Sequence, residues 1–156
     1  PGAGAEIPPL AHWLYFLPRA RQSEIGPDGH PRRGAFLPPV PLPRRMWAGG
    51  RLAFLQPLRV GEAATRESRI TAVDAKHGRS GPLVFVTVRH EVTGAQGLAL
   101  SEEHDIVYRD APQPGAPAAP PQPAPADAQF ARELVPDDVL LFRYSALTFN
   151  GHRIHY

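Results

Sequence analysis

The strongest hydrophobic pattern in the chain is a strand pattern at residues 83–92. Apolar residues alternate there, and both faces are largely apolar in the first half, which indicates a well-buried strand. Residues 93–97 read as a hairpin turn, and residues 98–109 return as a second strand. Residues 63–74 alternate more loosely, and residues 75–82 form a turn before the central strand. One face of the central strand carries Val84, Val86, Val88, His90 and Val92. Such long antiparallel strands predict an α+β domain with a strongly curved sheet.

Two shorter segments have helical spacing instead. In residues 10–20, Leu10, Trp13, Leu14 and Leu17 share one face until Pro18, which predicts a short amphipathic helix packed on the core. Near the end of the chain, Asp137 is a suitable N-cap, and its charge suits the positive end of a helix dipole. The apolar residues that follow Asp137 at helical spacing are Leu140, Leu141, Tyr144 and Leu147.

The stretch between the first helix and the strands, residues 26–50, is rich in glycine and proline. Pro27–Gly29 has the composition of a β-turn, because proline fixes φ and glycine supplies a positive φ. This stretch also contains large apolar residues: Phe36, Leu37, Val40, Leu42, Met46 and Trp47. They are expected to cover either the body of the domain or a ligand that lies along it. The strands are expected to begin at Arg51.

Proline also marks a division of the chain. Residues 111–128 are dominated by alanine and proline without large apolar groups, so they predict a stiff, extended linker. A docking motif for a proline-binding domain is the alternative. The expected organisation is a domain at 1–110, the linker at 111–128, and the start of a second unit at 129–156.

Composition narrows the possible classes of protein. The formal net charge is +2 and the arginines are scattered, so the sequence does not predict a nucleic-acid surface. The absence of cysteine excludes disulfides, thiolate metal sites and a cysteine nucleophile. No window approaches the ~20 apolar residues of a membrane span, and residues 1–9 do not resemble a signal peptide. We therefore expect a soluble cytoplasmic protein.

The last residues, 140–156, resemble the active-site segment of the MaoC-like hydratases, in which a short helix runs into Ser/Thr-Gly-Asp-x-Asn-Pro-Ile/Leu-His. The residues at these motif positions are Thr148, Phe149, Asn150, His152, Arg153, Ile154 and His155. Residues 26–50, with the strands at 83–92 and 102–109, resemble the N-terminal half of one subfamily. That subfamily contains mesaconyl-CoA hydratases and mitochondrial-type 3-hydroxyacyl-thioester dehydratases.

The resemblance implies a double hot-dog fold, in which each half wraps an antiparallel sheet around a central helix. The N-terminal half would help to form the acyl tunnel, and the C-terminal half would carry the catalytic pair. These enzymes hydrate enoyl thioesters, or dehydrate 3-hydroxyacyl thioesters, with no metal and no redox cofactor. The implied partner is an acyl-CoA thioester. The implied assembly is a homodimer, or completion by the protein's own C-terminal half. The thioester oxygen would be held beyond Tyr156, so we expect these 156 residues alone to be inactive.

The same resemblance suggests roles for individual residues. His155 is the candidate general base and acid, because imidazole can take and return a proton near neutral pH. Asn150 would orient the water, and since an amide cannot ionise, His152 could share the proton transfer. The candidate substrate-binding residues are Phe36, Leu37, Met46 and Trp47 for an acyl chain, with Arg45 and Arg153 for a carboxylate. Arg33 could also read a carboxylate, and Arg45 could instead meet the phosphates of CoA.

Several other interpretations remain open from the sequence. His152 and His155 could bind a metal ion or form a polar surface cluster. Asp28–His30 is interpreted as a turn rather than a site, and His90 and His104 as structural residues. The fragment could be a non-catalytic module that binds an acyl thioester or a partner. A thioesterase is a third possibility, because fold does not determine function, although its usual helix-borne carboxylate is not recognisable.

Overall fold

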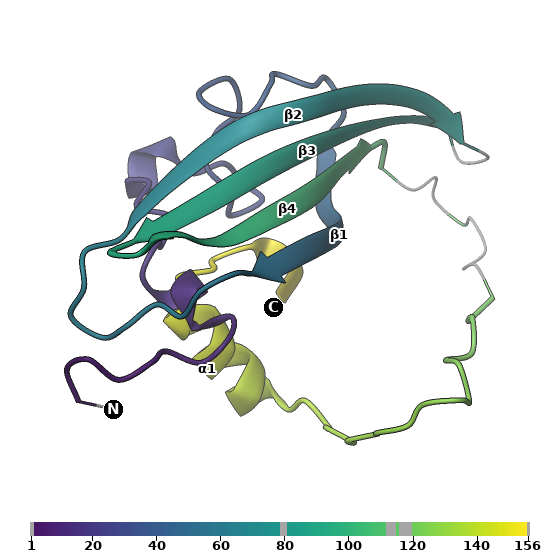
Figure 1. Cartoon of the computed structure of the whole chain (residues 1–156). Helices are drawn as coiled ribbons and strands as arrows, with labels where there is room; N and C mark the ends of the chain where they lie inside the picture. Colours follow the sequence, from purple (N-terminus) through teal and green to yellow (C-terminus); the bar gives the residue numbers. More distant parts are fainter. Residues whose placement is uncertain (1, 79–80, 112–114, 116–119, 156) are drawn as a thin grey trace.

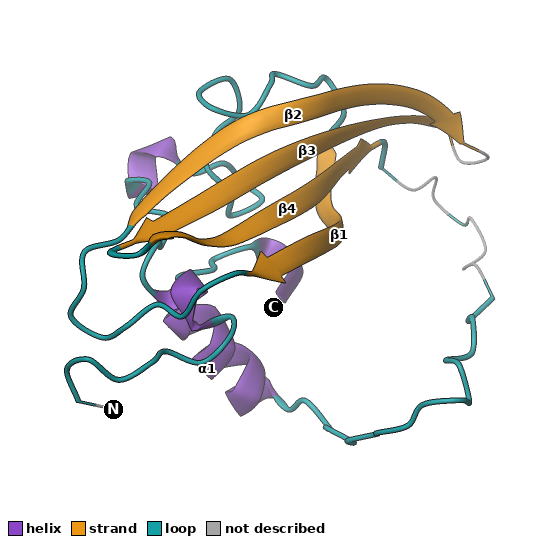
Figure 2. Cartoon of the chain, in the orientation of Figure 1, coloured by secondary structure: helices purple, strands orange, loops and turns teal. Residues whose placement is uncertain are grey.

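A computed structural model describes residues 2–78, 81–111, 115 and 120–155. Its main feature is a four-stranded antiparallel sheet in the order β1-β4-β3-β2 (Figure 1). The strands are β1 (Arg44–Phe54), β2 (Thr65–Gly78), β3 (Gly81–Gly94) and β4 (Gly97–Arg109). Figure 2 shows the long, strongly curved strands and the helices that lie outside the sheet. The predicted α+β class with a curved antiparallel sheet is confirmed.

The two central strands, β3 and β4, match the alternation in the sequence. Val86, Val88 and Val92 are buried on one face of β3, and Ile106 and Tyr108 are buried on the paired face of β4. The predicted hairpin is present, with Gly94 paired to Gly97. The other turn is tighter than predicted: residues 75–78 extend β2 and Gly81 already begins β3. The centre of that turn, at 79–80, lies outside the described residues.

The proline-rich segment covers one end of the sheet. Val40 and Leu42 are buried in one cluster with Val86, Val88, Ile106 and Tyr108, and Leu37 packs against it. A second cluster, formed by Leu58, Val92, Ala99 and Leu100, lies toward the opposite end. The apolar residues of 26–50 therefore divide between two environments. Leu37, Val40 and Leu42 cover the domain, while Phe36 and Trp47 remain 51% and 70% exposed.

Arg33 holds the proline-rich segment in place. Prolines have no N–H, so carbonyl groups in this segment cannot all be satisfied by a regular ladder. The Arg33 guanidinium donates to the carbonyls of Val40 and Pro43, each at 2.7 Å, and also to that of Leu42. It also stacks over the Tyr108 ring at 5.2 Å. These contacts give Arg33 a structural role, and its use as a carboxylate reader stays a prediction.

The N-terminal helix differs from the expectation. Instead of an amphipathic helix over residues 10–20, the chain forms one 3₁₀ turn, η1 (Ala11–Leu14). Leu10 has a left-handed φ of 70°, which helical residues do not adopt, and Leu17 precedes a proline that disfavours helix. The expected apolar face is also wrong, since Leu10 and Leu14 are largely exposed. The turn is held by polar contacts described below, and a second 3₁₀ turn, η2 (Gln22–Glu24), follows it.

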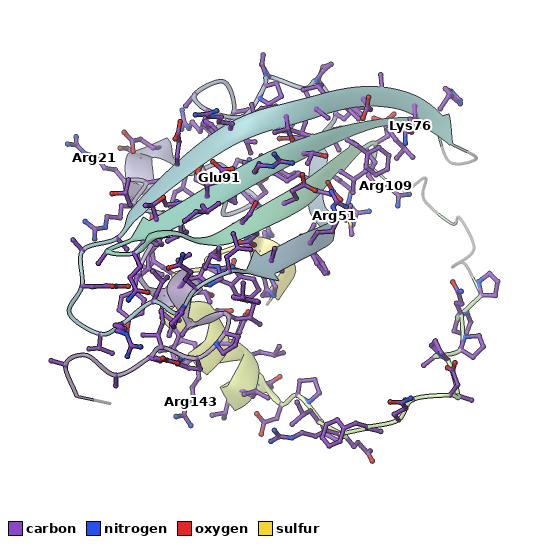
Figure 3. All side chains as sticks on the ribbon, in the orientation of Figure 1. Arg21, Arg51, Lys76, Glu91, Arg109 and Arg143 are labelled. Atoms are coloured by element: carbon purple, nitrogen blue, oxygen red, sulfur yellow. The ribbon has the colours of Figure 1, made fainter. Side chains whose placement is uncertain are left out.

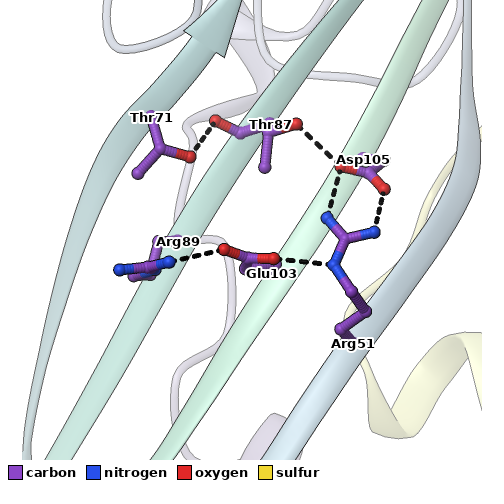
Figure 4. Close-up of polar contacts among 6 residues, drawn as sticks. All are labelled: Arg51, Thr71, Thr87, Arg89, Glu103 and Asp105. Carbon is purple, nitrogen blue, oxygen red and sulfur yellow. Dashed lines mark hydrogen bonds and ion pairs between the residues drawn. The ribbon is translucent and has the colours of Figure 1, made fainter.

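The face of the sheet opposite the buried valines of β3 carries a polar network (Figure 4). Arg51 on β1 donates to Glu103 at 2.7 Å and to both oxygens of Asp105 on β4. Arg89 and Thr87 on β3 donate to the same two carboxylates, at 2.7 and 2.8 Å. Such cross-strand pairs help to fix the register of the sheet. Arg51 lies within β1, so the strand begins at Arg44 and not at Arg51 as expected.

Beyond β4 the described chain has no helix or strand until α1 (Asp138–Leu147). Figure 1 shows residues 120–137 away from the sheet, and α1 close to the N-terminal segment. The apolar side chains of α1 are largely exposed: Val139, Leu140, Leu141, Phe142, Tyr144 and Leu147. Charged residues are spread over separate elements, as the labelled Arg21, Lys76 and Arg143 in Figure 3 illustrate. The domain boundaries at 110 and 128 stay a prediction.

Candidate functional site

Helix α1 delivers the motif residues to one place. As predicted, Asp137 is its N-cap, and the Asp137 side chain accepts a hydrogen bond from the Leu140 N–H at 2.7 Å. At its end, the Thr148 hydroxyl donates to the Tyr144 carbonyl at 2.9 Å. Phe149 then adopts a φ of 52°, in the left-handed region that favours glycine. The aligned motif has glycine at this position, so the backbone geometry supports the alignment. The loop ends in a short 3₁₀ turn, η3 (Arg153–His155).

Asn150 and His155 face each other within this loop. The Asn150 Oδ1 accepts a hydrogen bond from the His152 backbone N–H at 3.0 Å. Because a backbone N–H can only donate, this contact fixes the orientation of the amide. The Nδ2 group then lies 3.3 Å from His155 Nε2. An N–H donor in this position favours the His155 tautomer whose Nε2 is unprotonated, and the Nε2 lone pair accepts this hydrogen bond from Asn150.

The loop rests on a turn from the other end of the chain. The Arg153 N–H donates to the Asp28 carbonyl at 3.0 Å. Gly29 contacts Gly151 so closely that a Cβ on Gly29 would lie 2.0 Å from the Gly151 carbonyl oxygen. The rings of His30 and His152 stack with centroids 3.4 Å apart and planes 12° apart. The predicted turn at Asp28–His30 is therefore present, and it also belongs to the site.

Burial and a nearby cation keep the stacked histidines neutral. Burial lowers the pKa of His30 to about 4, with the positive charge of Arg45 and the neighbouring His152 adding to the effect. Burial and Arg45 also lower the pKa of His152. Asp28 acts in the opposite direction on both, and its Oδ2 lies 3.4 Å from His30 Nδ1. The site near neutral pH thus contains two uncharged imidazoles stacked face to face.

An open cleft of about 940 Å³ lies between α1 and residues 18–31. Asn150, His152 and His155 all line it, so the structure brings the three predicted catalytic residues to one surface. The apolar part of the lining includes Ile25, Leu141, Phe142 and Phe149. This combination of an apolar cleft and a few polar groups is typical of a small-molecule site.

The predicted substrate-binding residues are not gathered around this cleft. Phe36 and Trp47 are exposed, and Leu37 packs on the sheet. Met46 is half-buried on β1, and Arg153 is exposed on η3. Arg153 belongs to the motif loop itself. Arg45 on β1 is close enough for its charge to act on both His30 and His152. Its guanidinium donates to the Pro31 carbonyl at 3.2 Å, while its buried Nε has no partner among the described residues.

A second polar cluster lies on the buried face of the sheet. Glu102 on β4 accepts from Trp13 Nε1 at 3.1 Å and lies 3.2 Å from His12 Nε2. Burial alone would raise the pKa of Glu102, but the hydrogen bonds from His12 and Trp13 bring the pKa below its ordinary value. His90 Nδ1 lies 2.7 Å from the Ser68 hydroxyl. These contacts attach η1 to the sheet, and they agree with a structural role for His90.

The structure describes no group of three or more histidine, cysteine or acidic side chains that could hold a metal ion. Among the helices in the described part of the chain, none is long and apolar enough to cross a membrane.

The sequence profile of a protein family described as hydroxyacyl-thioester dehydratase type 2 matches residues 10–156. The chain belongs to this family. A mesaconyl-C(4)-CoA hydratase of Chloroflexus aurantiacus is 54% identical over 159 residues, covering 100% of this chain and 56% of the relative. A mitochondrial hydroxyacyl-thioester dehydratase type 2 of Schizosaccharomyces pombe is 25% identical over 173 residues, covering 96% of this chain and 57% of the relative.

This member of the type 2 dehydratase family therefore spans little more than half the length of these curated relatives. Among solved structures, HtdX from Mycobacterium tuberculosis is similar with a TM-score of 0.44 at 20% identity, over 70% of this chain and 41% of that one. Family membership confirms the resemblance drawn from residues 26–50 and 140–156 and, with the antiparallel sheet, the α+β hot-dog class.

Proposed function

We propose that the protein containing this chain is a hydro-lyase that adds water to enoyl-CoA thioesters or dehydrates 3-hydroxyacyl thioesters. The observation that carries the proposal is the pairing of Asn150 Nδ2 with His155 Nε2 at 3.3 Å on the wall of a cleft. Both relatives are named for these two directions of one reaction, and the chain aligns with each over nearly its whole length.

The chemistry requires one proton acceptor that also returns the proton. In the hydration direction, the water would first displace the Asn150 Nδ2 group from His155 Nε2. Nε2 would then take a proton from the water while the water oxygen bonds to the β carbon. The proton would then pass to the α carbon, so that one water molecule is added without oxidation or reduction. Asn150 cannot ionise, so it would hold and orient the water. His152 would serve mainly through its backbone N–H, which orients the Asn150 amide.

The relatives and the cleft support a proposed substrate class. The 54% identical relative is named for a mesaconyl-CoA, whose acyl group carries a second carboxylate. Among the arginines considered from the sequence, Arg45 has a charge that acts on both His30 and His152, so we propose it as the carboxylate reader. Phe36, Leu37, Met46, Trp47 and Arg153 stay candidates for contacts to the rest of the thioester.

We also propose that the site is completed by a second hot-dog half or by a second copy. All the large apolar side chains of α1 are exposed here, which a finished domain would bury. The boundaries at 1–110, 111–128 and 129–156, and a cytoplasmic location, belong to the same proposal.

The test is hydratase turnover on a small panel of enoyl-CoA thioesters, followed by the loss of conjugated-thioester absorbance. The chain and the full-length natural protein are compared, each with His155→Ala, Asn150→Asp and the control His77→Ala, which changes an exposed histidine on β2. We expect turnover in the full-length protein, loss of at least about 100-fold in His155→Ala, and no change in His77→Ala. Unchanged turnover in His155→Ala would contradict the assignment.

A non-catalytic acyl-thioester module is the second candidate, because Asn150 stands where the resembled motif has an ionisable aspartate. Tight acyl-CoA binding without turnover in the full-length protein would favour it. In that case Asn150→Asp would be the variant most suited to restore activity.

A further inference from the structure

The loop with Asn150 and His155 is attached to the turn at residues 26–31 by three separate contacts. They are the Arg153 N–H bond to the Asp28 carbonyl, the Gly29–Gly151 approach, and the His30–His152 stack. The turn has its own internal support. Gly29 N–H donates to the Gly26 carbonyl at 3.0 Å, and the His30 N–H donates to Asp28 Oδ1 at 3.1 Å. A rigid turn thus meets the loop along its backbone and along one ring.

We propose that this turn positions the catalytic loop, with His30 as its positioning residue. The inference rests on the proposed function and extends it, because the N-terminal domain would then shape the active site directly. His30 itself does not line the cleft, whereas His152 does. His30 therefore acts through another residue and is not a catalytic residue.

The effect passes from His30 to His155 through a series of direct contacts. The His30 ring holds the His152 ring nearly parallel to itself, and the contacts of Gly29 and Asp28 hold the backbone on either side of His152. The His152 N–H then orients Asn150 Oδ1 at 3.0 Å, which turns Nδ2 toward His155. If the loop were not held, the Asn150 amide would lose the contact that decides which end faces His155.

The stack depends on ring shape rather than on a proton held by His30. Desolvation and Arg45 favour the neutral ring of His30, and His152 has the same preference. Two neutral rings can stay in contact at this distance, whereas two imidazolium rings beside Arg45 would repel. A flat, uncharged ring such as phenylalanine should therefore replace His30 in this role.

The experiment compares His30→Ala, His30→Phe and the control His77→Ala by two measurements. In the 156-residue chain, NMR follows the Asn150 side-chain amide and the ring resonances of His152 and His155. In the full-length protein, kcat and KM are measured separately. We expect His30→Ala to shift these resonances and lower kcat by about 10- to 100-fold with little change in KM, because small misplacements cost rate. His30→Phe should keep most of both, and His77→Ala should change neither.

Two results would overturn the inference. One is that His30→Ala leaves the Asn150 amide and His155 resonances unchanged. The other is that His30→Phe is as impaired as His30→Ala while remaining folded, since a ring would then not suffice. If the wild-type protein shows no hydratase turnover, the proposed function fails, but the NMR comparison still decides whether His30 positions the loop.

Discussion

Gly29 provides the sharpest structural test of the contact between the turn and the loop. It has a φ of 80°, and a Cβ there would lie 2.0 Å from the Gly151 carbonyl oxygen and 2.9 Å from His152 Cα. These are backbone atoms, so no flexible side chain can move aside. Non-bonded heavy atoms prefer separations of about 3.5 Å, so Gly29→Ala should displace the loop by roughly 1–1.5 Å.

The matched control is Gly34→Ala. Gly34 has a φ of 93°, and a Cβ there meets nothing within 4 Å. Both substitutions carry the left-handed penalty of roughly 1–2 kcal/mol in the free energy of unfolding, but only Gly29→Ala also clashes with the loop. A displacement of about 1 Å can reduce turnover by about 100-fold.

The assay combines urea unfolding of both variants with hydratase turnover in the full-length protein. We expect similar losses of stability from the positive φ, with a fall of at least about tenfold in kcat for Gly29→Ala alone. If Gly29→Ala turned over substrate as fast as Gly34→Ala, the loop would not depend on this contact and the reasoning would be refuted.

Three further predictions follow from the described contacts. Arg33→Met should lower the free energy of unfolding by about 2 kcal/mol, because part-buried carbonyls of the proline-rich segment lose a charged donor; urea unfolding measures this, and a loss no larger than that caused by the same substitution at an exposed arginine would contradict it. Asp137→Ala should destabilise the start of α1 by about 1 kcal/mol, while Asp137→Asn keeps the cap; faster amide exchange at Leu140 in both variants would be inconsistent with capping. The pKa of His30 is depressed to about 4 by burial, Arg45 and His152, against Asp28. Its contribution to stability is therefore complete above pH 6.5 and is lost as the pH falls toward 4, so melting temperatures of His30→Phe should depend less on pH over this range than those of the wild type.

The central strands were predictable because local alternation and burial agree. Val86, Val88 and Val92 alternate in the sequence and are buried in β3, with the predicted hairpin between Gly94 and Gly97. The start of β1 was placed too late, because Arg44, Arg45, Gly49 and Gly50 suggest a turn. Pairing with β4 outweighs that local preference, and a register shift between Trp47 and Gly49 accommodates the irregularity.

The prediction of a helix over residues 10–20 was wrong for a related reason. The spacing of Leu10 and Leu14 suggested an apolar contact face, but His12 and Trp13 make the decisive contacts, both with Glu102 on β4. Glu102 lies far along the chain, and nothing within residues 10–20 indicates that a carboxylate of the sheet will contact them. By contrast, the cap at Asp137 depends only on residues within one turn, so the sequence was sufficient to predict it.

The candidate site shows the same division between local and distant information. Asn150, His152 and His155 lie on one loop, so a motif of consecutive residues could indicate them. His30 and Gly29 join the site only through contacts with His152 and Gly151. The available signal was the Asp-Gly-His sequence of the turn. Its composition is fully explained by the turn, so it does not indicate the contact with the loop of Asn150 and His155.

The most direct test of the central claim is hydration of an enoyl-CoA thioester by the full-length protein in oxygen-18 water, followed by mass spectrometry of the products. The account predicts one labelled oxygen on the β carbon of an intact CoA thioester, with the label incorporated far more slowly in His155→Ala. Label in a free carboxylate with release of CoA would instead identify hydrolysis of the thioester. That outcome, or equally fast labelling in His155→Ala, would contradict the proposed reaction.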